Sequence, residues 1–166
     1  MSETLIETRL LLERVITDFQ SEPKGNAAGP PTLISSNIDY CETVARLGAR
    51  AITPEAAAAT LQAGERLPVA VIDANALFET SQQAVTLVSH LRDVCAEQVL
   101  VIGSQNASTL DRGTLTSLGF HRWQKSLDGA DNRTWFIFDL AHYKVTPDWL
   151  NPRHWANPEL WDKYRW

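Results

Sequence analysis

Two apolar runs limit most strongly what this chain can fold into. They cover residues 67–73, which end on an aspartate, and residues 98–103, which begin with a glutamine, and both are rich in valine, leucine and isoleucine. Runs of this length and composition are typical of strands that are buried on both faces of a sheet. Such strands need helices on both sides, so the two runs predict an α/β protein with a mainly parallel sheet.

Segments with helical spacing separate the expected strands. Helices are predicted over residues 4–19, from Asn37 to Gly48, from Thr53 to Gly64, and over residues 80–96 and 110–118. Shorter strands are predicted over residues 32–35 and 50–52. Asparagine and threonine are good helix N-caps, and glycine commonly ends a helix, so these residues set the expected bounds.

The last part of the sheet is expected to be antiparallel. Residues 120–127 and 134–140 read as two adjacent strands, and Asp128 and Gly129 begin the turn between them. Two strands joined by a short turn run antiparallel. The expected sheet therefore has about six strands, is mainly parallel, and ends in a C-terminal antiparallel β-hairpin.

The length of the chain, 166 residues, predicts a single domain. We place this α/β domain at residues 1–140 and a Trp-rich tail that packs on it at residues 141–166. Residues 20–31 contain three prolines and two glycines, which exclude both a helix and a central strand. This stretch is therefore expected to be a long loop.

Composition and charge argue against several classes of protein. No apolar run reaches the ~20 residues needed to cross a bilayer, and the first residues lack the basic region of a signal peptide, so we expect a cytoplasmic protein without membrane contact. The net charge of −5 argues against a general nucleic-acid binder. The histidines lack metal-ligand spacing, and Cys41 and Cys95 fall on apolar helix faces, so we expect no metal site and two buried thiols.

The order of elements resembles the class I S-adenosylmethionine-dependent methyltransferase fold, which is Rossmann-like. Residues 115–120, Leu-Thr-Ser-Leu-Gly-Phe, are similar to that family's approach to its last two strands. Residues 69–73 and 99–103 are similar to its fourth and fifth strands. The resemblance spans roughly residues 30–140 and lacks one strand–helix unit before Val69, which is why about six strands are expected rather than seven.

Two positions depart from the cofactor site of this family. The family's first strand leads into a glycine-rich loop, whereas this chain has Ser35, Ser36 and Asn37 there. The family's second strand usually ends on an acid that holds the ribose hydroxyls, whereas this strand is followed by Thr53. The resemblance therefore implies a degenerate site, and we expect no cofactor; the alternative is that S-adenosylmethionine binds through an atypical loop.

Polar residues are expected to gather at one edge of the sheet, because ligands of open α/β sheets bind outside the carboxyl ends of the strands. Asp73 and Asn75 hold the place of the family's catalytic loop and are the candidate catalytic residues. The candidate cofactor-binding residues are Ser35, Ser36, Asn37, Thr53, Gly103 and Ser104. The same residue types also cap helices and form turns, and Asp73 could simply hydrogen-bond the turn after it, so a purely structural interpretation stays open.

Tryptophans are concentrated in the C-terminal tail. Its candidate partner-binding residues are Trp149, Trp155, Trp161 and Trp166, three of which recur every six residues. Tryptophan dominates both cores and protein interfaces. The tail is therefore expected either to bury its rings on the domain or to bind a protein partner or a second copy of the chain.

Two classes of function remain at this point. The first is a non-catalytic methyltransferase-like module that acts by binding a protein partner. It rests on the glycine-free first turn, the missing acid after the second strand and the aromatic tail. The second is an S-adenosylmethionine-dependent methyltransferase with an atypical cofactor loop.

Overall fold

A six-stranded mixed sheet organises the chain, with the strand order β2-β1-β3-β4-β6-β5. The computed structural model describes residues 3–21, 29–62, 66–76, 80–102, 109–123 and 135–139. The strands are β1 (Thr32–Ile34), β2 (Arg50–Ile52), β3 (Leu67–Asp73), β4 (Ala96–Ile102), β5 (His121–Arg122) and β6 (Trp135–Asp139). Strands β1 to β4 are parallel to one another, whereas β6 runs antiparallel to both β4 and β5. The predicted α/β class and the C-terminal antiparallel pair are confirmed.

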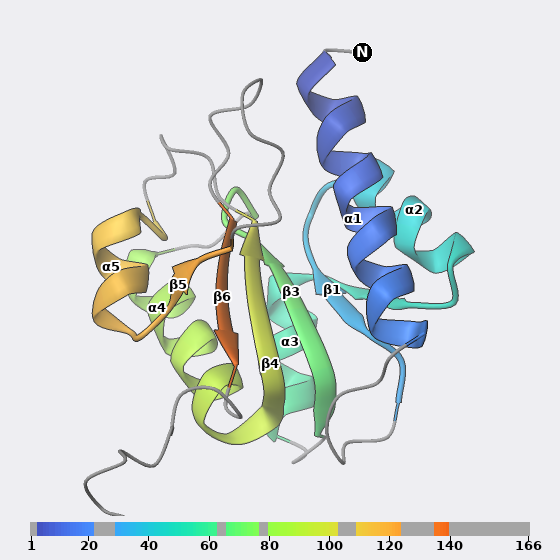
Figure 1. The fold of residues 1–166 in the computed structure, drawn as a ribbon. Helices are drawn as coiled ribbons and strands as arrows, with labels where there is room; N and C mark the ends of the chain where they lie inside the picture. Colours follow the sequence, from blue (N-terminus) through green and yellow to red (C-terminus); the bar gives the residue numbers. More distant parts are fainter. Residues whose placement is uncertain are drawn as a thin grey trace, which may run out of the picture.

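Helices cover both faces of this sheet (Figure 1). They are α1 (Glu3–Ser21), α2 (Ile38–Arg46), α3 (Pro54–Gln62), α4 (Ser81–His90) and α5 (Arg112–Ser117), and α4 continues into a π-helix, η1 (Leu91–Cys95). Helices α1 and α2 pack on one face, in a cluster with Leu33, Val71 and Leu100. Helices α3, α4 and α5 pack on the other face, in a cluster with Ile34, Ile72 and other strand residues. The strands are thus buried on both faces, as their apolar runs predict.

The helix caps follow the sequence signals closely. The Asn37 side chain accepts hydrogen bonds from the first turn of α2, and the Thr80 side chain does the same for α4. Gly48 and Gly119 follow α2 and α5 with φ values of 74° and 83°. Side chains other than glycine rarely adopt this backbone conformation, so glycine at these two positions lets each helix end and the chain turn back.

We expect Gly48→Ala to lower the free energy of unfolding by about 1–2 kcal/mol, because alanine is strained at positive φ. The added methyl group itself meets nothing closer than Gln20 Nε2 at 4.0 Å, so the cost would come from the backbone alone. The matched control is Gly113→Ala in α5, whose new methyl group would lie in ordinary contact with Asp111. It should be neutral or stabilise by up to about 1 kcal/mol. Equal effects of the two substitutions in urea unfolding would contradict this explanation.

The structure corrects the expected helix over residues 80–96. Regular α-helix ends at His90, and the next turn is wider, with the Ala96 N–H bonded to the Leu91 carbonyl oxygen five residues earlier. Strand β4 then starts directly at Ala96. Because no loop residues separate helix and strand, the wide turn makes the connection. Arg92 holds this corner in place: it pairs with Asp93 at 2.6 Å and lies over the Phe138 ring.

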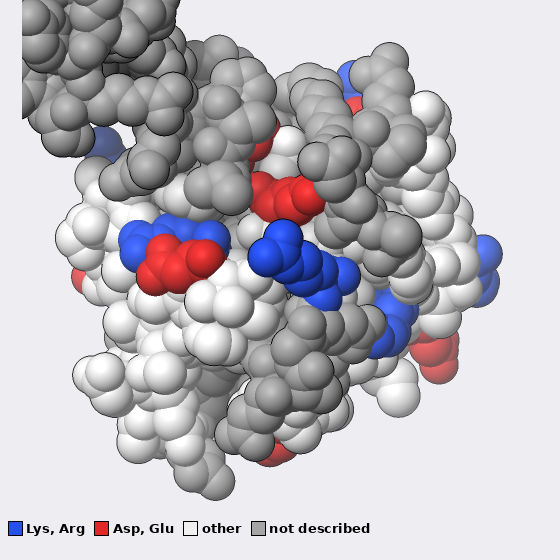
Figure 2. All heavy atoms as spheres, turned by 90° about the horizontal axis from the view of Figure 1, so that it is seen from below, with Lys and Arg blue, Asp and Glu red and all other residues white. Residues whose placement is uncertain are grey.

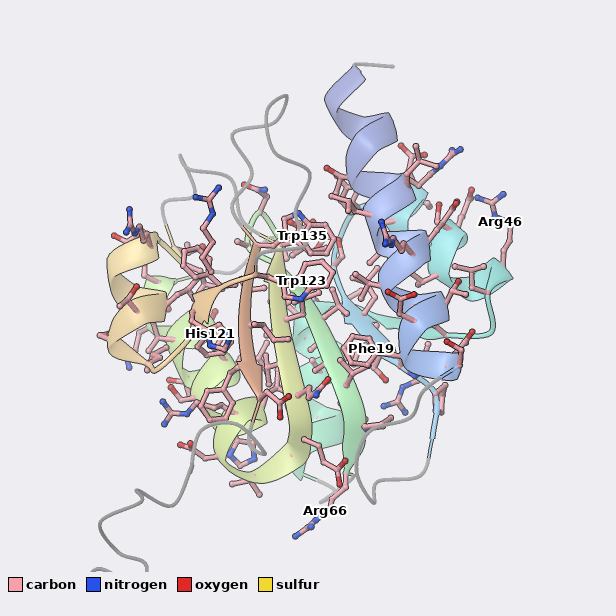
Figure 3. All side chains as sticks on the ribbon, viewed as in Figure 1. Phe19, Arg46, Arg66, His121, Trp123 and Trp135 are labelled. Carbon is pink, nitrogen blue, oxygen red and sulfur yellow. The ribbon has the colours of Figure 1, made fainter. Side chains whose placement is uncertain are left out.

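The two antiparallel strands are shorter than predicted, and a tryptophan pair lies beside them. Strand β5 has only two residues, and the Trp123 N–H extends the pairing by donating to the Trp135 carbonyl oxygen. The Trp123 and Trp135 rings stack with centroids 5.6 Å apart (Figure 3). On the same strand, Phe136 and Phe138 pack on the opposite face, so side chains along β6 alternate between the two faces of the sheet.

Surface charge is mixed rather than of one sign on the face seen from below (Figure 2). Described Lys or Arg and Asp or Glu side chains lie next to one another there. None of the helices in the described part of the chain combines the length and the apolar character that a membrane crossing requires.

Candidate functional site at the switch point of the sheet

The sheet reverses its winding between β1 and β3. Strand β1 lies between β2 and β3, and the helices that follow β1 and β3 pack on opposite faces, α2 on one and α4 on the other. The two connections therefore diverge as they leave the carboxyl ends of their strands. In open α/β sheets this topological switch point opens the crevice in which ligands bind. The N-terminal turns of α1 extend beyond the same edge of the sheet (Figure 1).

Ser35 and Asp73 meet across this switch point. The Ser35 hydroxyl donates to Asp73 Oδ2 at 2.9 Å, and the Asn75 backbone N–H donates to Asp73 Oδ1 at 2.9 Å. Ser35 is 1% exposed and Asp73 4% exposed. The residue that follows β1 and the residue that ends β3 are thus joined in a buried polar pair. The structural interpretation of Asp73, a bond to the turn that follows it, is correct as well.

The turn after β1 is organised without glycine. The Asn37 N–H donates to Ser35 Oγ at 3.0 Å, while the Asn37 side chain accepts from the N–H groups of Asp39 and Tyr40. Asn37 has φ −83° and ψ 114°, an ordinary extended conformation. Ser35 turns its side chain into the protein toward Asp73, and Ser36 is exposed. The turn therefore needs no glycine for its backbone, and the Ser35 hydroxyl is engaged by Asp73.

Cys41 lies against the same turn and corrects a prediction. Its thiol is half-buried rather than buried, and it donates to the Ser35 carbonyl oxygen at 3.6 Å. Burial, and then the negative charge of Asp73, raise the pKa of Cys41. The group therefore stays a neutral thiol at physiological pH. The other cysteine, Cys95, is buried as predicted.

Glu55 is a further candidate residue near the carboxyl end of β2. Thr53 follows β2 and lies one strand away from the Ser35–Asp73 pair, since the Ser35 N–H donates to the Ile52 carbonyl oxygen. Hydrogen bonds from the Thr53 side chain and from its own backbone N–H lower the pKa of Glu55, so it stays ionised. Strand β2 itself ends at Ile52 without an acid, but the Glu55 carboxylate follows three residues later. The signal was present in the residues Thr53-Pro54-Glu55, which the sequence analysis used only as a helix start.

Apolar side chains on β4 and β6 lie next to the Ser35–Asp73 pair along the sheet. Asp73 pairs with Ile102 on β4, and Ile102 pairs with Trp135 on β6. Ile102 and Trp135 face the α1 side, and alternation along the strands puts Ser35 and Asp73 on that side too. The Asn75 side chain is exposed beside this row. The edge of the sheet therefore presents polar groups at β1 and β3 and apolar groups at β4 and β6.

Several candidate residues lie outside the described part of the chain. They are Gly103, Ser104, Trp149, Trp155, Trp161 and Trp166, together with Gly64 and most of the 20–31 loop. Binding of a protein partner through the four tryptophans stays a prediction. Among the described residues, no group of three or more His, Cys, Asp or Glu side chains is arranged to hold a metal ion.

The fold defines a class of protein, a doubly wound α/β domain, and this one has a buried polar pair at its switch point. Comparison with known families then places the chain. Residues 10–166 match the family of unknown function DUF6231, and the chain belongs to this family. No curated protein matches its sequence.

Solved structures with a similar fold are methyltransferases. One is the magnesium protoporphyrin IX methyltransferase ChlM of Synechocystis PCC 6803 with bound SAH, at 9% identity and a TM-score of 0.50, covering 81% of this chain and 83% of the other. The same enzyme with bound SAM matches at 10% identity and a TM-score of 0.48, covering 80% and 78%. The methyltransferase-like fold is thereby established for this chain.

This likeness overturns the expectation of no cofactor. A solved protein with this fold holds SAH, which points toward S-adenosylmethionine rather than toward an empty fold. The expectation rested on two departures, the absence of glycine after the first strand and the absence of an acid after the second. The structure shows that the turn after β1 forms without glycine, with the Ser35 side chain buried and bonded to Asp73.

Proposed function

We propose that this chain is an S-adenosylmethionine-dependent methyltransferase that binds its cofactor at the switch point between β1 and β3. The observation that carries the proposal is the buried Asp73 carboxylate, hydrogen-bonded to Ser35 where the sheet reverses its winding. A buried carboxylate needs a functional or structural reason, because its desolvation is costly. The methyltransferase-like fold supports this choice of ligand class.

The residues around the crevice fit this cofactor chemically. The Glu55 carboxylate and the Thr53 hydroxyl, after β2, would hydrogen-bond the ribose hydroxyls. The exposed Ser36 would line the approach beside β1. When bound, S-adenosylmethionine supplies a methyl group carried on a positively charged sulfur.

The chain itself would hold the acceptor substrate. Asn75, exposed next to Asp73, has both a donor and an acceptor with which to orient a polar group. Asp73 is fixed by its bonds to Ser35 and Asn75, so its position would change little when a ligand enters. Such preorganised polar groups favour catalysis, because they need no rearrangement during the reaction.

Thermal unfolding with and without S-adenosylmethionine or S-adenosylhomocysteine tests the proposal. A ligand present at 100 times its dissociation constant stabilises the folded state by about 2.7 kcal/mol. For a chain of this size we expect the unfolding midpoint to rise by about 5–10 °C. The absence of any shift at millimolar concentrations of both ligands would contradict cofactor binding.

A variant of Glu55 tests where the ligand binds. Glu55→Gln removes the carboxylate after β2, so it should weaken both ligands by a similar factor of about five to ten, because both carry the same ribose. Glu42→Gln, on the exposed side of α2, is the matched control and should leave both affinities unchanged. Unchanged binding by Glu55→Gln would remove this residue from the site.

A further inference from the structure

We propose that Asp73 makes the switch-point site selective for a positively charged ligand, so that S-adenosylmethionine binds more tightly than S-adenosylhomocysteine. This inference rests on the proposed function and adds to it the charge of the preferred ligand. It assigns Asp73 as a specificity-determining residue, in addition to its position beside the acceptor.

Asp73 has no cationic partner among the described residues. Its hydrogen-bond donors are the Ser35 hydroxyl and the Asn75 backbone N–H, both of which are neutral. The nearby Cys41 thiol is also neutral, since burial and Asp73 raise its pKa. Within the described part of the chain Asp73 takes part in no ion pair.

Burying a carboxylate without an opposite charge beside it costs free energy. Asp73 is 4% exposed, so water screens its charge little. Buried charges in proteins are normally paired with an opposite charge or coordinate a metal. An ionised carboxylate accepts about four hydrogen bonds, so beyond the two donors found among the described residues Asp73 keeps acceptor capacity for a further interaction. A cationic ligand in the crevice would supply the missing charge.

S-adenosylmethionine and S-adenosylhomocysteine differ in the charge on their sulfur. S-adenosylmethionine carries a sulfonium, whereas S-adenosylhomocysteine carries a neutral thioether in the same place, and the remaining groups are identical. A carboxylate near this sulfur attracts only the first of them. The same charge would help the demethylated product to leave after transfer, because its attraction to Asp73 is lost with the methyl group.

Isothermal titration calorimetry with both ligands tests this inference. We expect the unaltered protein to bind S-adenosylmethionine about tenfold more tightly than S-adenosylhomocysteine, as one charge–charge interaction near a protein surface can provide. In Asp73→Asn the two affinities should become equal, through a loss for S-adenosylmethionine alone. Asparagine is of similar size and can keep both hydrogen bonds, with its oxygen accepting from Asn75 and its amide donating to Ser35.

The matched control is Asp39→Asn, which removes a carboxylate from the exposed first turn of α2, close to the same turn. It should keep the tenfold preference of the unaltered protein. Equal affinities of the unaltered protein for both ligands, or a preference that persists in Asp73→Asn, would overturn the selectivity while leaving the proposed function intact. Failure of both ligands to bind would overturn the proposed function itself.

A second measurement keeps the test valid if Asp73→Asn does not fold. Sinefungin resembles S-adenosylmethionine but carries a protonated amine beside the position of the sulfonium. The unaltered protein should bind sinefungin more tightly than S-adenosylhomocysteine, and this preference should change little between low and high salt, because buried charges are screened weakly. A preference for the neutral ligand would overturn the inference.

Discussion

Trp135→Ala is expected to lower the free energy of unfolding by about 3–5 kcal/mol, the largest stability loss that we predict for a single truncation. Trp135 is 1% exposed and belongs to the cluster that holds α1 and α2 against the sheet. Its ring also stacks on Trp123 with centroids 5.6 Å apart. The substitution therefore opens a cavity and removes a ring contact at the same time. Urea unfolding followed by circular dichroism measures the loss.

The control for this prediction is Leu10→Ala on α1. Leu10 is 53% exposed on the side of the helix that faces away from the core, so its truncation should change stability by less than about 0.5 kcal/mol. If Trp135→Ala cost no more than Leu10→Ala, the ring would not be part of the core that joins α1 to the sheet.

Ser35→Asp is expected to lower the free energy of unfolding by about 3–5 kcal/mol at neutral pH, because it buries an unpaired charge. The Ser35 hydroxyl lies 2.9 Å from Asp73 Oδ2, so the new carboxylate would replace a donor with a like charge in a buried position. Under the proposed function cofactor binding should be lost with it, since the pair lies at the switch point where the cofactor is proposed to bind.

The pH dependence of this variant gives a second measurement. Repulsion raises the folded-state pKa of one carboxyl of the pair, so the folded state binds more protons than the unfolded state. Stability should therefore be lost as the pH rises and partly recovered as it falls toward about 4. Ser36→Asp is the matched control: Ser36 is exposed, and its substitution should stay within about 0.5 kcal/mol at every pH. A flat pH profile for Ser35→Asp would show that the two carboxyls do not interact.

Apolar runs, helix caps and glycines at helix ends were predicted correctly from the sequence, because these features depend on a residue and its near neighbours. The apolar runs at residues 67–73 and 98–103 predicted β3 and β4, and their burial on both faces required the helices that the structure has. Asn37, Gly48 and Gly119 marked helix ends, because capping and positive φ are properties of single residues. The wide turn at Leu91–Cys95 escaped prediction, since it depends on how α4 must meet β4.

The candidate site, in contrast, depends on contacts between residues that are far apart in the sequence. Ser35 and Asp73 were each selected as polar residues after strands, but their hydrogen bond joins residues that are 38 positions apart. The absence of glycine after the first strand suggested a degenerate site, but the Ser35 side chain is bonded to Asp73, a contact that only the folded chain reveals. Glu55 was not selected because it lies on α3, three residues beyond the end of β2.

The sequence by itself determined which segments become strands and helices, that they form a mainly parallel α/β sheet, and that its last two strands run antiparallel, because burial, capping and turn formation depend on a residue and its near neighbours. Only the tertiary structure decided that the sheet reverses between β1 and β3, and that a buried carboxylate without a cationic partner among the described residues lies there. Strand order and the pairing of distant polar groups arise from long-range packing, which local patterns do not encode.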